Sequence, residues 1–250
     1  MVEASTNFRK NGFGDEESAN LARISALLQN VADEEISAGE ATDFIISQIK
    51  GFNIAAEDSI HIVDAVNQVA NEYSLSSGDL IKNLGTVSAA LSVGGNKFEE
   101  VLGLMVSGTE IMRQSNKVAR SLISVQSRLN QILDEESSTG KALTAWYQEH
   151  NIAIYDQEGQ IRSLYDILTD VNKQWGSLSK NEQAYYLNIQ AGANQTASLA
   201  AILSNFDTAL QSTETALNST GSAVRENERY MSSLNKMGLT SLTAGTPLEL

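Results

Sequence analysis

Cysteine is absent from this 250-residue chain, so disulfides, thiolate nucleophiles and zinc–thiolate sites are excluded. Proline occurs once, as Pro247, against 17 glycines. Because proline removes a backbone donor and breaks helices, a chain that nearly lacks it can run one helix after another. The shortage also argues against a loop-rich β-sandwich. Both absences favour a helical protein.

Long apolar runs are missing as well. No stretch approaches the ~20 apolar residues that a membrane span needs. The first seven residues lack the basic and apolar regions of a signal peptide. We therefore expect no membrane segment and no signal peptide. With 42% hydrophobic and 19% charged residues, the composition is that of a globular chain that can bury a core.

Positive charge is scarce. The chain has 17 Lys and Arg residues against 31 Asp and Glu residues, a formal charge of −14. Nucleic-acid binding depends on clustered basic side chains that neutralise phosphates, so we expect no direct binding to nucleic acid. The one local basic group has helical spacing and is interpreted as a solvated helix face. It comprises Arg113, Lys117, Arg120 and Arg128.

Residues with catalytic or ligand chemistry are few and scattered. The two histidines, His61 and His150, lie far apart in the sequence and suggest no metal site. Acidic pairs such as Glu99-Glu100 fall at expected helix ends or in polar segments, and no aromatic-rich cleft accompanies them. Glycine motifs for phosphate or dinucleotide binding do not occur. We therefore expect no catalytic, cofactor-binding or metal-binding residues, no cofactor, and no enzyme activity.

Apolar residues at intervals of three and four predict amphipathic helices throughout residues 1–133. The expected helices cover about 15–31 and 37–52, followed by four stretches between 56 and 133. Ser76 and Asp79 form a helix-start signal, and Gly94-Gly95 forms a stop. Single helices of this length are unstable alone, so they must pack on one another. We expect an N-terminal helical array.

The acidic stretch at 134–140 has no apolar side chain and is predicted to be a linker. Beyond it, residues 151–162 predict a small β-hairpin that Gly159 would close with a positive φ. Helices then resume, starting at Ser163 and Ser179 and near residues 193 and 221. The sequence thus predicts a mainly α fold with two subdomains of antiparallel amphipathic helices, the second (141–236) containing the hairpin. Residues 237–250 are interpreted as a tail that resembles an added expression sequence.

Large rings at helical spacing usually belong to a core, so we predict Trp146 and Trp175 to be buried rather than exposed as partner anchors. Some aromatic side chains of the second half are nevertheless expected to stay exposed for protein contacts. The candidates are Trp146, Tyr147, Tyr155, Tyr165, Trp175, Tyr185 and Tyr186.

Several stretches, taken together and in order, resemble the core region of phage tail tape-measure proteins. They are Val31–Glu40 with Asp43–Lys50; Asp64–Asn71 with Ser76–Leu80 and Phe98–Glu100; Asn151–Ile154, Asp156 to Gly159, Ile161–Leu168, Trp175 and Ala191-Gly192; and Ala216–Ala223 with Glu226, Tyr230 and Ser233. They cover nearly all of residues 1–236. The apolar residue that the family usually has before the Ala-Gly pair is only weakly kept, as Ile189-Gln190.

The resemblance implies a piece of a longer structural protein from a phage or prophage. Such proteins are made in the bacterial cytoplasm, lie inside the virion tail tube and help to set tail length. It also implies tail-tube subunits and tail assembly chaperones as partners, with self-association as a further possibility. The alternative is a helical protein unrelated to phage, either a cytoplasmic adaptor or a secreted acidic effector.

Overall fold

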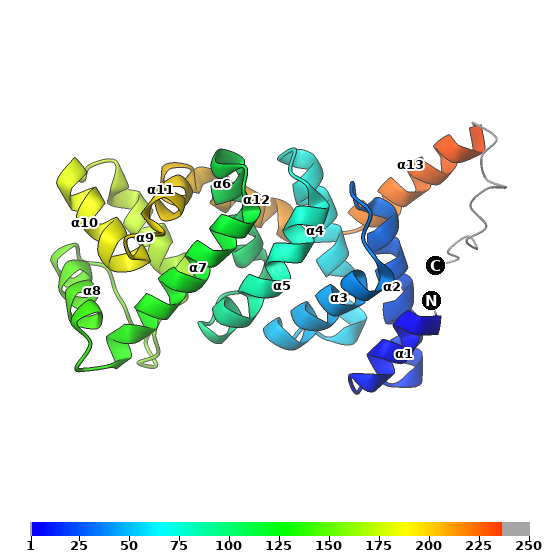
Figure 1. Cartoon of the computed structure of the whole chain (residues 1–250), viewed down its shortest axis with the longest axis horizontal. Coiled ribbons are helices and arrows are strands. Elements are labelled where there is room, and N and C mark those ends of the chain that lie inside the picture. Colours follow the sequence, from blue (N-terminus) through cyan, green and yellow to red (C-terminus); the bar gives the residue numbers. More distant parts are fainter. Residues whose placement is uncertain (1, 237–250) are drawn as a thin grey trace. The chain divides into compact units, whose positions relative to one another are not determined.

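A computed structural model describes residues 2–236 of the chain (Figure 1). Within that range the regular elements are α-helices and short 3-10 helices, so the prediction of a mainly α protein is confirmed. The contacts divide the chain into two compact units. Among the described residues, unit 1 joins residues 2–81 to residues 215–236, and unit 2 is the continuous stretch 82–214.

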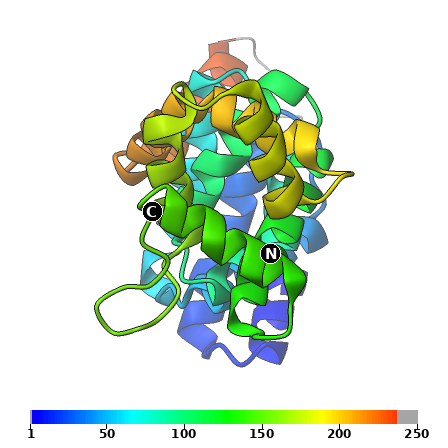
Figure 2. The ribbon, with the colours of Figure 1, turned by 90° about the vertical axis from the view of Figure 1, so that its left-hand side faces the viewer.

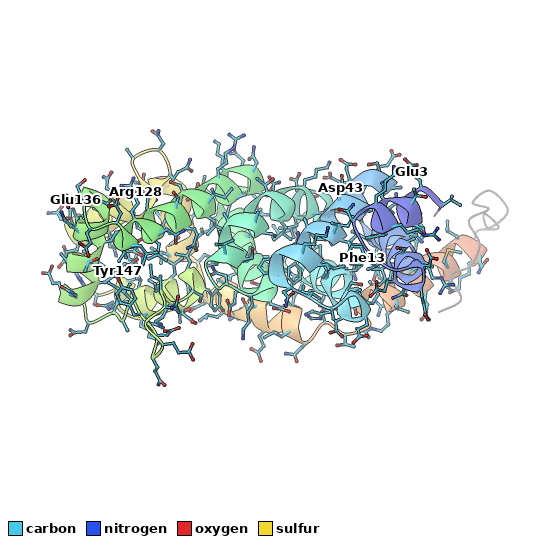
Figure 3. All side chains as sticks on the ribbon, turned by 90° about the horizontal axis from the view of Figure 1, so that it is seen from below. Glu3, Phe13, Asp43, Arg128, Glu136 and Tyr147 are labelled. Carbon is cyan, nitrogen blue, oxygen red and sulfur yellow. The ribbon has the colours of Figure 1, made fainter. Side chains whose placement is uncertain are left out.

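Unit 1 is built around α2, which contacts α1, α3, α4 and α13. Its core side chains come from the apolar stripes of these helices, and Leu21, Ile45 and Ile62 are fully buried. At the edge of this core the Phe13 ring lies edge-on to Phe8, with centroids 5.8 Å apart (Figure 3). The helices are α1 (Val2–Lys10), α2 (Asp15–Val31), α3 (Ala38–Phe52), η1 (Ala56–Asp58), α4 (Ile60–Glu72) and α13 (Ser222–Lys236).

The late segment of unit 1 is attached through a buried carboxylate on α4. Asp64 is only 2% exposed, and its two oxygens accept hydrogen bonds from the backbone N–H groups of Gly221 and Ala223, at 2.8 and 2.9 Å. Beside it, Asn67 Nδ2 donates to Ser222 Oγ at 2.8 Å. The first N–H groups of a helix have no partner within the helix. Asp64 therefore caps α13 from a distant part of the chain.

Unit 2 is built around α7, which contacts α6, α8, α10 and α11. Its largest fully buried side chains include Phe98, Tyr147, Tyr186 and Phe206. The helix α5 (Ser77–Val93) leads into it. The helices that follow are α6 (Phe98–Met112), α7 (Ser115–Asn130), η2 (Gln131–Leu133), α8 (Ser138–Glu149), α9 (Leu164–Trp175), α10 (Lys180–Ala191), α11 (Thr196–Ser204) and α12 (Phe206–Leu217).

Four helix starts follow the predicted capping chemistry. Ser37 and Ser179 each accept from the backbone N–H three residues later, and the glutamate there returns the bond to the serine N–H. Ser76 and Ser163 likewise accept from the N–H three residues on. Two expectations fail. Helix α1 was not predicted, and the single helix expected from about residue 193 is two helices separated at Asn205.

The predicted β-hairpin at 151–162 is wrong. These residues form only one isolated bridge, between Tyr155 and Ile161, and the segment stands out as a loop between α8 and α9 (Figure 2). The turn is held locally, because Asp156 Oδ1 accepts from the N–H groups of Glu158 and Gln160, both at 2.9 Å. Such side-chain bonds compete with a strand ladder. Gly159 does have the predicted positive φ, at 80°.

The structure also divides the chain differently from the predicted linker at 134–140, which lies inside unit 2. Residues 138–140 form the first turn of α8, capped by Ser137, whose hydroxyl accepts from Gly140 N at 3.1 Å. Gly140 itself is buried against the backbone of η2. A short polar segment can thus be packed through its backbone without any apolar side chain. The tail expected at 237–250 lies outside the described residues.

Candidate functional site

The two histidines lie in different units, His61 in α4 and His150 at the end of α8. His150 has a structural environment. Its ring stacks on Trp146 with centroids 4.0 Å apart, and its Nδ1 lies 2.8 Å from the Trp146 carbonyl oxygen. Within the described residues, no group of three or more His, Cys, Asp or Glu side chains could hold a metal ion.

The acidic pairs serve helix ends. The Glu100 carboxylate accepts from Lys97 N at 2.8 Å at the start of α6. Partial burial, the largest effect, and the negative charges of Asp166 and Glu99 raise the pKa of Glu100, although the Lys97 N–H opposes this. In the segment after η2, Asp134 Oδ1 accepts from Glu136 N. Both carboxylates thus hold backbone N–H groups at helix ends or turns.

A buried polar network links α8, α10 and α7 in unit 2. Tyr147 donates to Gln190 Oε1 at 2.6 Å, and Gln190 Nε2 donates to Val125 O at 3.0 Å. The Tyr186 hydroxyl lies 3.2 Å from that of Tyr147. Burial raises the pKa of both phenols well above the ordinary value, so they stay neutral and act as hydrogen-bond donors. The network is therefore part of the packing of unit 2.

Both tryptophans pack around this network. Trp146 is 3% exposed, as predicted, and Trp175 is half-buried with its ring 6.1 Å from that of Tyr186. Tyr147 and Tyr186 are fully buried, whereas Tyr155 and Tyr185 are 44% and 52% exposed. Tyr165 is half-buried like Trp175, so three of the seven rings are buried, two are half-buried and two are exposed. The prediction of burial is confirmed for Trp146 and only in part for Trp175, and the expectation that some rings face solvent is confirmed.

An open cleft of about 660 Å³ lies beside the 153–163 segment of unit 2. Two of its charged side chains, Asp156 and Arg162, have hydrogen-bond partners. Arg162 donates to Ala153 O and to Asp170, at 2.8 and 2.7 Å. Partial burial opposes the charge of Asp170, but the hydrogen bonds from Lys173 and Arg162 prevail and lower its pKa. The cleft residues are Gly95, Ala153, Tyr155, Asp156, Gln157, Gln160, Ile161, Arg162, Ser163 and Asp166. Nothing in this set forms a nucleophile–base pair, and the cleft is a surface hollow.

The predicted basic face divides into two parts. Arg128 is structural, because its Nε donates to Ile189 O at 2.8 Å near the end of α10 (labelled in Figure 3). Arg113, Lys117 and Arg120 are exposed and form no ion pair or side-chain hydrogen bond with other residues of 82–214. The interpretation as a solvated helix face is therefore confirmed for Lys117 and Arg120, whereas Arg113 is exposed at the end of α6.

Two features escaped the sequence analysis. The Asp64 contact joins residues more than 150 positions apart, and no local pattern distinguishes it from the other carboxylates of a helix. The cleft depends on how the 151–162 loop folds over Gly95. The turn predicted at Asp156 and Gly159 was the one sequence signal for this loop.

None of the described helices is long and apolar enough to cross a membrane. Two helical units, with their polar side chains directed at helix caps and core, define an α-helical protein. Residues 1–189 match the model of the phage-related minor tail protein family. The match covers well over half of the chain, so the chain belongs to that family and has a structural role in a phage tail. No solved structure matches the chain. The family assignment replaces the alternative of an adaptor or effector unrelated to phage.

Proposed function

We propose that this chain is a region of a tape-measure protein, which occupies the tail tube and helps to set tail length. The observation that carries the proposal is the ordered resemblance along residues 31–233, set on a fold whose described regular elements are helices. A helix converts residue number into length at about 1.5 Å per residue, which is the property a molecular ruler needs.

The chain can form compact units when free and an extended ruler in the tube if its helices exchange contacts with one another for contacts with the tube. The α-helices are 9 to 17 residues long, too short to be stable without packing. In the free chain their apolar stripes cover one another. Inside a narrow tube the same stripes would pack against tube subunits, while the helices follow each other along the tube axis.

Tail-tube subunits and tail assembly chaperones are the proposed partners. Unit 2 keeps several large apolar side chains exposed, and such side chains provide contact area for a protein partner. They are Ile111 (53%), Leu133 (68%), Tyr155 (44%), Tyr185 (52%) and Leu210 (38%).

The proposal is tested by deleting residues 2–236 in frame from the phage that encodes this chain. If the region lies extended and helical in the tube, tails should shorten by about 350 Å, at about 1.5 Å per residue. A tandem duplication should lengthen them by the same amount. Electron microscopy of purified virions measures both. The control replaces the region with an unrelated helical sequence of equal length, which should restore the original length. Tails of unchanged length in both the deletion and the duplication would contradict the proposal.

A further inference from the structure

Asn11 and Gly12 form the one Asn-Gly pair of the sequence. They lie in the turn between α1 and α2 of unit 1, and both residues are exposed. Glycine has no side chain to keep its backbone nitrogen away from the side chain of the residue before it. Every other asparagine in the chain precedes a residue that has a side chain. The amide of Asn11 is therefore the one most open to attack by the backbone.

A cation of α3 lies beside this amide. Lys50 Nζ donates to the Asn11 main-chain oxygen at 2.9 Å and to Asn11 Oδ1 at 3.4 Å. The same ammonium lies 6.0 Å from the centre of the Phe13 ring, which is labelled in Figure 3. Both the backbone and the side chain of Asn11 thus face a positive charge from another helix.

We propose that Asn11 is a site of deamidation and that Lys50 promotes the reaction. The Gly12 backbone nitrogen loses its proton and attacks Asn11 Cγ, so that an N–Cγ bond forms and the Cγ–Nδ2 bond breaks. Nδ2 leaves as ammonia with the proton that Gly12 lost, and a five-membered succinimide ring remains. One water molecule then opens the ring at either carbonyl and gives aspartate or isoaspartate. The net change replaces one NH by one oxygen.

The position of Lys50 favours the attack. Negative charge develops on Asn11 Oδ1 as the nitrogen adds to Cγ, and the ammonium already lies beside that oxygen. A donor aimed at an oxygen where charge develops lowers the barrier. The carboxylate that forms then remains next to the same cation. Because Lys50 is exposed, water screens the interaction, and the acceleration is expected to be only about threefold.

The attack also requires the last turn of α1 to open. Gly12 N donates to Arg9 O at 3.0 Å, and Asn11 Nδ2 donates to Asn7 O at 3.0 Å. These bonds hold the two reacting groups apart. Helix α1 has nine residues and buries only two side chains. A short helix with so little buried surface opens locally at a small cost in free energy.

Isoaspartate should loosen the connection between α1 and α2, because it adds one carbon to the main chain. The bond from Phe13 N to Phe8 O, at 3.3 Å, and the edge-on contact of the two rings both depend on the present length of this turn. Hydrogen exchange should therefore accelerate at residues 12–14 in the isoaspartate protein. The Asn11→Asp protein, which has the normal main chain, should keep the wild-type exchange rates there.

The test incubates the full chain at mildly alkaline pH, which favours loss of the Gly12 proton. Mass spectrometry follows the tryptic peptide that contains Asn11, and liquid chromatography separates its aspartate and isoaspartate forms. Asn20, which lies in α2 and precedes leucine, is in the same peptide and should keep its amide. Lys50→Met should slow the reaction at Asn11 about threefold, whereas Lys50→Arg, which keeps the cation, should not.

The matched control is Lys82→Met, which removes an exposed cation from α5 and should react like the wild type. Far-ultraviolet circular dichroism should show all variants to be helical. The proposal is overturned if Asn11 keeps its amide, if Asn20 reacts as fast as Asn11, or if Lys50→Met reacts as fast as Lys82→Met. Tail length does not enter any of these measurements, so this proposal and the proposed function fail independently.

Discussion

Gly140→Ala should destabilise unit 2 by about 1–3 kcal/mol, although alanine is usually the better helix former. A Cβ at residue 140 would lie 2.7 Å from the carbonyl carbon of Gln131, closer still to its oxygen, and 3.1 Å from Ile132 Cα. These are backbone atoms of η2 and cannot rotate away as a side chain would. The start of α8 would have to move. Because Trp146 and Trp175 both lie in unit 2, tryptophan fluorescence during urea denaturation reports the loss directly.

Gly176→Ala is the matched control. Gly176 ends α9 with φ −69° and ψ −20°, which alanine adopts without strain, and a Cβ there would meet nothing within 4 Å. This substitution should be neutral or should stabilise by about 0.4–1 kcal/mol, because it reduces the conformational entropy of the unfolded chain. If the two variants unfold at the same urea concentration, the start of α8 does not pack against the backbone of η2 as described.

Asp64→Ala should lower the free energy of unfolding of unit 1 by about 3 kcal/mol. The substitution leaves the N–H groups of Gly221 and Ala223 without their acceptor in a buried position, and such losses cost about 1–3 kcal/mol per group. It also removes a negative charge from the N-terminus of α13, where the helix dipole favours one. Hydrogen exchange should accelerate at residues 221–223 before it changes in α2 or α3.

The control for Asp64 is Asp43→Ala, which removes an exposed carboxylate from α3 in the same unit (labelled in Figure 3). Surface substitutions of this kind usually change stability by less than about 0.5 kcal/mol. Asp64→Asn should fall between the two, since the amide keeps one acceptor oxygen. Equal exchange rates at residues 221–223 in the Asp64→Ala and Asp43→Ala proteins would show that Asp64 does not hold α13.

The helices that could be predicted from the sequence are those whose signals are local. Ser37 with Glu40 and Ser179 with Glu182 marked helix starts correctly, because a capping box involves only four consecutive residues. Gly94-Gly95 marked the end of α5 for the same reason. Apolar stripes identified α2 and α3 with nearly the observed bounds.

The features that could not be predicted depend on contacts with residues far away in the sequence. Helix α1 is short and polar, and only its contacts with α2 and α3 explain why Ala4 and Phe8 are buried. The break at Asn205 is fixed by bonds from its side chain to Ser107 O and Glu110, about a hundred residues earlier. The return of residues 215–236 to unit 1 likewise depends on Asp64.

Cross-linking mass spectrometry of purified virions tests most directly whether this chain works inside the tail tube. With a lysine-reactive reagent, the exposed lysines Lys117, Lys141 and Lys180 should cross-link to residues on the inner surface of the tube subunits. Those cross-links should disappear once the tails have ejected their DNA, if the chain leaves with it. A chain absent from purified virions, or cross-linked only to the outer surface of the tail, would contradict the account.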